Sequence, residues 1–157
     1  MKNSTNFHKT FILFFLISFI FTQHFEVQIE STGESTLFIF QDNIPNLESG
    51  DELGLFDLNG IIDDQGNTGE ILVGAGTWTG SQLELATITA VNLSEFGGPI
   101  LPGAFAGNTM SLKVWKDAEG MEYDASYTTS QGSGSFNGLF TAIDAVILDS
   151  PHFEVEI

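Results

Sequence analysis

The sequence predicts an all-β domain, an antiparallel β-sandwich of immunoglobulin-like or jelly-roll-like type, on three observations. Short segments in which apolar and polar residues alternate recur along the chain, and this period of two is typical of a strand with one buried face. Turns rich in glycine, asparagine and proline separate these segments roughly every 8 to 12 residues. No segment combines a helical period with helix caps. We therefore expect about seven or eight strands in one sandwich.

The chain begins with a segment that we interpret as a secretory signal peptide, residues 1–23. Lys2 and Lys9 precede the apolar run Phe11–Phe21, and a polar end follows. This is the order of a signal peptide, and the run is short for a membrane span, which needs about 20 apolar residues. An uncleaved anchor is the alternative, because Phe21-Thr22-Gln23 lacks the small residues of a usual cleavage site. We expect a secreted, extracellular or cell-surface protein.

The sandwich domain is expected to span residues 24–148, and its first half contains five strands. His24–Ile29 alternates, and Ser35–Gln41 is apolar on both faces until the turn at Pro45. Gly50–Asp57 is a short strand, followed by a polar loop over 58–70. In Ile71–Trp78 the two glycines predict a bulge or a close backbone approach, and we expect Gln82–Val91 to be the hairpin partner of this strand.

The second half opens with a glycine- and proline-rich connection, residues 92–108, which is long for a compact domain. Thr109–Trp115 alternates, and the turn at 116–120 leads into Met121–Thr128 as its hairpin partner. A serine- and glycine-rich stretch, 129–138, precedes the last long strand, Leu139–Leu148.

The opening strand returns at the end of the chain, where residues 149–157 form a separate terminal segment. His24-Phe25-Glu26-Val27-Gln28-Ile29 recurs as His152-Phe153-Glu154-Val155-Glu156-Ile157. Such a copy either is a strand donated to a neighbouring molecule, with its backbone supplying affinity and alternate side chains filling pockets, or begins a further repeat. The assembly residues would be Phe25, Val27, Ile29, Phe153, Val155 and Ile157.

Composition limits the classes of function. The formal net charge is −17, so nucleic acid is not an expected partner. There is no cysteine, and after the signal segment histidine occurs only at His24 and His152, which leaves no cysteine nucleophile and no evident catalytic arrangement. We expect a protein that is not an enzyme.

One acidic loop could bind calcium, the only cofactor that the sequence suggests. It contains Asp57, Asn59, Asp63, Asp64 and Asn67, and calcium takes about six to eight oxygen ligands from such groups. The spacing does not fit an EF-hand, because Ile61 stands at a ligand position and Thr68 at the closing one. A solvated acidic turn is the alternative.

Three segments resemble a β-sandwich module of secreted bacterial surface proteins. They are Gly50–Asp57 (GDELGLFD), Val73–Ala75 and Gly107–Trp115, followed by Glu122-Tyr123. The module is similar to a GDEIGVFD strand, a CVGA strand and an RVWD strand in that order. In such proteins the module is often repeated, each copy opening on a His-Phe strand, which implies a binding or structural role. The loop after Asp57 is longer here, and the 92–108 connection is richer in glycine and proline.

We therefore expect a secreted structural or adhesive subunit that assembles head to tail, through its terminal strand, into a filament or surface array. Its partners would be copies of itself or neighbouring modules. The alternative is a carbohydrate-binding module that uses the 92–108 loop and the aromatic residues Trp78, Trp115, Tyr123 and Tyr127 to stack on glycans. Core packing of these aromatic side chains competes with that role.

Overall fold

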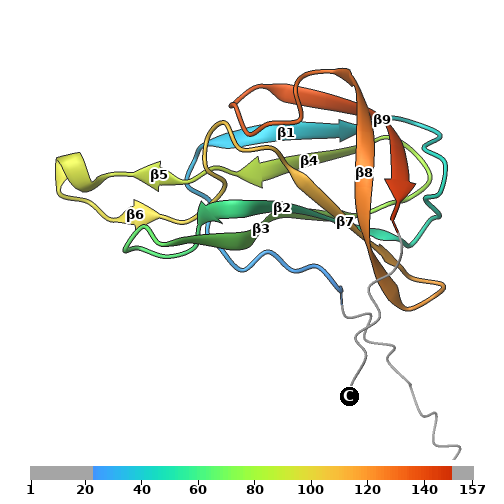
Figure 1. The fold of residues 1–157 in the computed structure, drawn as a ribbon, viewed down its shortest axis with the longest axis horizontal. Helices are drawn as coiled ribbons and strands as arrows, with labels where there is room; N and C mark the ends of the chain where they lie inside the picture. The colour runs from blue at the N-terminus through green and yellow to red at the C-terminus, as the bar shows by residue number, and fades with distance from the viewer. Residues whose placement is uncertain (1–22, 150–157) are drawn as a thin grey trace, which may run out of the picture.

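The computed structural model describes residues 23–149 as an all-β domain, which confirms the expected class (Figure 1). The expected signal peptide, apart from Gln23, and residues 150–157 of the terminal segment lie outside the described residues. The strands are β1 (Ser35–Phe40), β2 (Glu52–Ile61), β3 (Thr68–Thr77), β4 (Leu83–Ile88), β5 (Val91–Asn92), β6 (Ile100–Leu101), β7 (Ser111–Lys116), β8 (Met121–Gln131) and β9 (Phe140–Leu148), with a short 3-10 turn, η1 (Ser94–Phe96).

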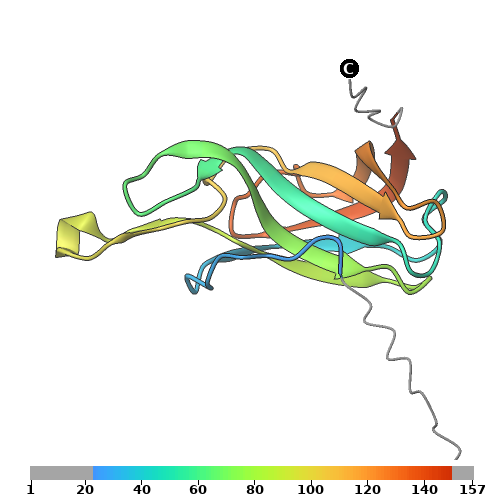
Figure 2. The same cartoon turned by 90° about the horizontal axis from the view of Figure 1, so that it is seen from below.

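Seven of these strands form a single sheet in the order β3-β2-β7-β8-β9-β1-β4. Every neighbouring pair is antiparallel except β1 and β9, which are parallel. The sheet curls until its two end strands, β3 and β4, lie against each other (Figure 2). The strands therefore make one sheet that is nearly closed on itself, whereas the sequence predicted a sandwich.

Strand β8 connects the two halves of this curled sheet. Its first part, Met121–Ala125, pairs with β7, and its second part, from Ala125 to Gln131, pairs with β9. The register with β9 shifts twice near Thr129, which is the mark of bulges that bend a strand. Bending lets one long strand leave the β2–β7 half and enter the β9–β1–β4 half.

The core fills the inside of the curled sheet. It consists of the inward-facing side chains, which alternate with outward-facing ones along the strands. β7 shows the pattern plainly: Leu112 and Val114 are buried, and Ser111, Lys113 and Trp115 face outward. Aromatic side chains give the core much of its volume, and Phe38 meets Phe136 edge to face at 5.7 Å. The largest fully buried apolar side chains are Trp78, Phe38, Phe40, Phe136, Leu53, Leu55, Leu112, Ile143, Val73, Val114 and Val146.

Strands β3 and β4 do not form the expected hairpin, because β3 pairs with β2 and β4 pairs with β1. The predicted close approach at the two glycines is confirmed. A Cβ atom on Gly76 would lie 2.5 Å from Leu85 Cδ2, and one on Gly74 would lie 3.0 Å from Thr87 Cγ2. The glycines let β4 side chains rest directly on the β3 backbone, so the two strands pack without pairing.

The two expected loops are more regular than the sequence suggested. β2 and β3 extend through most of the predicted 58–70 loop as a hairpin whose register shifts between Asp57 and Gly60. Leu58 and Asn59 are both exposed there, so the apolar alternation that marks a half-buried strand is lost. The 92–108 connection contains β5, η1 and β6, which project from the main sheet as an arm (Figure 1).

The expected first strand, His24–Ile29, is not a strand. Its alternation still predicts the buried side correctly: Phe25 is buried and Val27 and Ile29 are half-buried, whereas Glu26 and Gln28 are exposed. The segment lies over β2, which already pairs with β3 on one side and β7 on the other. Because β2 offers no unpaired edge, the segment docks through side chains on its outer face.

Candidate functional site: the His-Phe docking site

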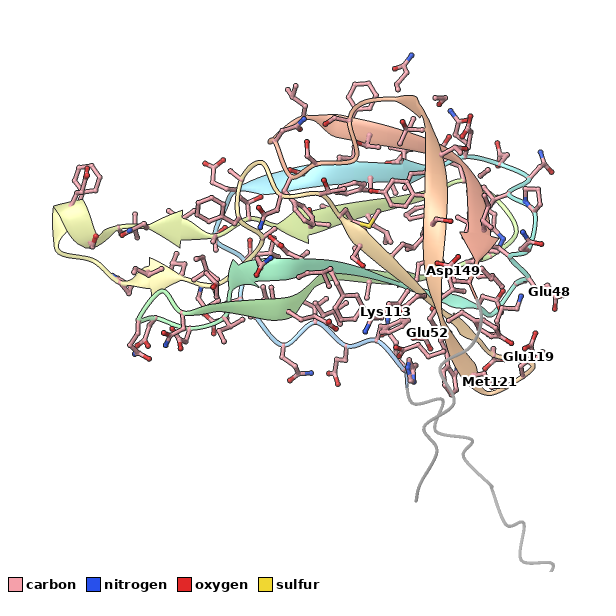
Figure 3. All side chains as sticks on the ribbon, in the orientation of Figure 1. Glu48, Glu52, Lys113, Glu119, Met121 and Asp149 are labelled. Carbon is pink, nitrogen blue, oxygen red and sulfur yellow. The ribbon has the colours of Figure 1, made fainter. Side chains whose placement is uncertain are left out.

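The outer face of β2, β7 and β8 presents two rows of side chains that run across the three strands. The pairing register places each row, because Glu52 and Glu122 are both opposite Trp115, and Gly54 and Asp124 are both opposite Lys113. Figure 3 labels one residue of each row, Glu52 on β2 and Lys113 on β7. We call this face the His-Phe docking site; its first row is Glu52, Trp115 and Glu122, and its second row is Gly54, Lys113 and Asp124.

His24 spans the first row of the docking site. Its backbone N–H donates to Glu52 Oε2 at 2.8 Å, and its ring stacks on Trp115 with centroids 3.9 Å apart and planes 12° from parallel. The ring Nε2 lies 2.8 Å from Glu122 Oε2. One residue therefore contacts all three strands, and its backbone, ring face and ring nitrogen each have a partner.

Phe25 lies over the second row, against the glycine. Its backbone N–H donates to the same Glu52 Oε2 at 3.0 Å, and its ring meets Phe56 edge to face at 5.8 Å. A Cβ atom on Gly54 would lie 2.9 Å from the Phe25 ring and 2.8 Å from the Phe56 ring. Such distances are not compatible with a side chain, so the slot for Phe25 exists because position 54 is glycine.

Burial confirms that the segment is seated tightly. Phe25 is 4% exposed, and Glu52 is 9% exposed although it is on the outer face of the sheet. A carboxylate in such a position needs hydrogen-bond donors, and the two consecutive backbone N–H groups supply them. The docking site thus recognises both the backbone and the rings of the His-Phe pair.

Lys113 provides the positive charge beside this site. Its Nζ lies 2.9 Å from Glu70 Oε1 and 3.6 Å from Glu122 Oε1, and 4.7 Å from the centre of the Phe56 ring. Partial burial alone would lower the pKa of Lys113, but the hydrogen bond to Glu70 and the surrounding carboxylate charges outweigh it and raise that pKa. Lys113 therefore stays charged and links β7 to β3 and β8.

A polar groove of about 540 Å³ continues from Lys113 along the same face. Its lining includes Leu58, Glu70 and Asp149. The Asp149 N–H donates to the Asp124 carbonyl oxygen at 2.8 Å, so the last described residue of the chain is held beside β8. Asp149 therefore lines the same groove as Glu122, whose carboxylate faces the His24 ring.

The proposed calcium ligands are separated by the fold into two groups. Asp57 and Asn59 are on β2, and Asp57 is 1% exposed. Its carboxylate accepts hydrogen bonds from the Asn59 and Phe105 N–H groups and from Asn108 Nδ2. Asp57 therefore holds the 105–108 segment against the sheet.

Asp63, Asp64 and Asn67 lie in the turn between β2 and β3. The Asp63 carboxylate accepts hydrogen bonds from the side chain and backbone of Asn67 and from the Gln65 N–H, and these lower the pKa of Asp63. Asp64 accepts a hydrogen bond from the Gln65 side chain. Within residues 23–149, no three acidic or histidine side chains are grouped so that they could hold one metal ion.

The aromatic residues that could have stacked on sugars are mostly engaged with the protein itself. Trp78 is 2% exposed in the core, and His24 covers one face of Trp115. Tyr127 donates to the Met110 carbonyl oxygen at 2.9 Å, and burial raises the pKa of Tyr127 to about 12. Tyr123 donates to Glu119. The 92–108 arm borders a hollow of about 310 Å³ with an apolar lining that includes Phe105.

Comparison with known protein families, curated sequences and solved structures yields no match. The resemblance to a repeated bacterial surface module therefore stays a prediction. Among the residues that the structure describes, no helix is long and apolar enough to span a membrane.

Proposed function

We propose that this chain is a secreted, non-enzymatic structural or adhesive unit. Its His-Phe segments would join it head to tail to like units, in a filament or surface array. One observation carries the proposal. His24-Phe25 docks on the outer face of its own domain through Glu52, Gly54 and Trp115, and the chain carries a second copy of the same segment after the domain.

The docked copy supports a direction of assembly. A His-Phe segment binds the domain that follows it in the chain, so the segment His152–Ile157 suits the next unit. That unit is either a second molecule, to which the segment is donated, or a further module of the same array. In both cases only Asp149–Pro151 separate the end of β9 from the next His-Phe pair.

The geometry favours docking over addition of a strand to a sheet. Strand addition needs an unpaired edge. β2, on which His24-Phe25 docks, is paired on both sides, and residues 24–29 form no strand. We therefore propose that Phe153 seats on Gly54 of the next unit as Phe25 does here, with Val155 and Ile157 following Val27 and Ile29.

The domain of residues 24–148 is best treated as one unit for this role. We propose that it is a flattened sandwich whose layers are β3-β2-β7 and β9-β1-β4, with β8 crossing between them. Docking of His24-Phe25 fixes how the chain enters this unit. The carbohydrate-binding alternative receives less support, because Trp78 is in the core and His24 covers Trp115.

A tandem chain tests the proposal. Residues 24–151 would be followed directly by a second copy of residues 24–157, and small-angle X-ray scattering would give the separation of the two domains. From the end of β9 to the next His-Phe pair the chain takes four Cα–Cα steps, which reach at most about 14 Å, so we expect one fixed, extended separation. A broad distribution of separations, as for beads on a flexible string, would contradict a structural array.

A further inference from the structure

We infer that the His-Phe docking site also binds in trans, taking His152-Phe153 of a second copy of this chain when its own His24-Phe25 is released. This inference rests on the proposed function and names the surface of the partner. The site is Glu52, Gly54 and Trp115 with Glu122, and the ligand is a His-Phe peptide segment in an extended chain.

The first reason is that every contact of the docked copy uses atoms that the second copy also has. The backbone N–H groups of His24 and Phe25 bind Glu52, and the two rings contact Trp115 and Gly54. Pro151 precedes the second copy, but a proline removes only its own N–H and leaves that of His152 available.

The second reason is that the copies differ where the site makes little contact. Glu156 replaces Gln28. Gln28 is exposed, and its side chain makes a 3.5 Å hydrogen bond to the carbonyl oxygen of Glu26 within its own segment. The replacement therefore removes no contact with the sheet.

The third reason is the shape and chemistry of the site. The ring slot over Gly54 admits an aromatic ring pressed on bare backbone, and the buried Glu52 carboxylate requires two donors next to that ring. A segment with His and Phe in the reverse order would offer both N–H groups but would place the rings in the wrong rows. The site consequently reads the order of the pair.

Competition between the two copies sets when trans binding occurs. A segment attached to the same chain acts at an effective concentration on the order of millimolar, so it fills the site in dilute protein. Weakening the attached copy opens the site to the terminal segment of another molecule. Because the segment and the site are different surfaces, each bound molecule offers a further site, and the contact propagates.

The test uses the full chain from His24 to Ile157 with Phe25→Ala, studied by sedimentation velocity from about 10 to 500 µM, below the effective concentration of the attached copy. We expect the unmodified chain to stay monomeric and Phe25→Ala to show a weight-average mass that rises at least about twofold with concentration. The double variant Phe25→Ala with Phe153→Ala should return to the monomer. Phe96→Ala, at the tip of the exposed arm, is the matched control and should also be monomeric.

A second measurement protects the test against misfolding. The peptide HFEVEI, added in excess, should disperse the Phe25→Ala oligomer, whereas the reversed-pair peptide FHEVEI should not. If Phe25→Ala loses its β-sheet circular dichroism, His24→Ala replaces it in the same series.

Two results would overturn the inference. The first is a Phe25→Ala chain that remains monomeric, even if it does so because its terminal segment folds back onto its own docking site. The second is association that persists unchanged when Phe153 is also replaced. Either result leaves the tandem-chain test of the proposed array intact. Conversely, if Phe25→Ala associates through Phe153 but the tandem chain is flexible, the proposed array is rejected and the inference about the docking site stands.

Discussion

Replacement of Phe25 by alanine is the most informative perturbation of stability. The side chain is 4% exposed, and burying a phenylalanine contributes about 1.5 to 3 kcal/mol. Its edge-to-face contact with Phe56 adds about 0.5 to 1.5 kcal/mol. Phe25 lies at the surface of the sheet, outside the main core, so water can enter the vacated space and little cavity cost is added. We expect a loss of about 2 to 4 kcal/mol in the free energy of unfolding.

Urea denaturation followed by circular dichroism measures this loss. The midpoint should fall with an unchanged slope, because the surface exposed on unfolding is nearly the same. Phe96→Ala is the control, since Phe96 is 87% exposed and its loss should cost less than about 0.5 kcal/mol. Equal midpoints for Phe25→Ala and Phe96→Ala would refute the view that Phe25 is docked.

Three further changes test other parts of the structure. Gly54→Ala should destabilise the protein by about 1 to 3 kcal/mol in urea denaturation, because the new methyl group occupies the Phe25 slot; an unchanged midpoint would contradict the slot. Lys116→Met should cost about 3 to 5 kcal/mol, since it leaves the buried Asp51 carboxylate without the Nζ that lies 2.6 Å away; a cost below about 1 kcal/mol would show that water reaches the pair. The pKa of Tyr127 is about 12 in the folded protein and about 10 for an unfolded tyrosine, so the stability of the unmodified protein should fall as pH rises from 10 to 12. Tyr127→Phe should lessen this fall. Identical pH profiles for the two proteins would reject the raised pKa of Tyr127.

The strands with clear alternation could be predicted from the sequence. β7 lies where its alternation placed it, and β1, β8 and β9 lie where the segments between turns placed them. Pairing was harder to predict, since alternation records which face is buried and says little about which strand lies alongside. Gly74 and Gly76 were recognised as a site of close backbone approach. The approaching strand is β4, which packs on the face of β3 and does not pair with its edge, so the hairpin prediction was wrong.

The docking site was predicted only from the side of the segment. The repeat of His24-Phe25 marked the segment as important, and its alternation placed Phe25 inward correctly. The residues that bind the segment were not recognised. Glu52 and Trp115 are 63 positions apart in the sequence (115 minus 52), and only the β2–β7 register brings them together. The one signal in the sequence was Gly54, a glycine inside a strand pattern, which often marks a close approach of another part of the chain.

The carboxylate pattern was misleading for a related reason. Asp57 and Asp63 are close in sequence, but a strand places Asp57 inward while Asp63 lies in the turn. Acidic residues in a row can therefore serve as hydrogen-bond acceptors for separate backbone segments. To tell such acceptors from metal ligands, one must know where β2 ends, and the polar residues of the β2–β3 turn hide that end in the sequence.

Amide hydrogen exchange at Phe25 tests the central claim most directly. The Phe25 N–H lies outside any strand, yet it donates to Glu52 Oε2 in a buried position. We expect it to exchange far more slowly than in a free peptide, and Glu52→Ala to remove that protection while the amides of β7 remain slow. Exchange of the Phe25 amide at the free-peptide rate in the unmodified protein would contradict docking of the His-Phe segment.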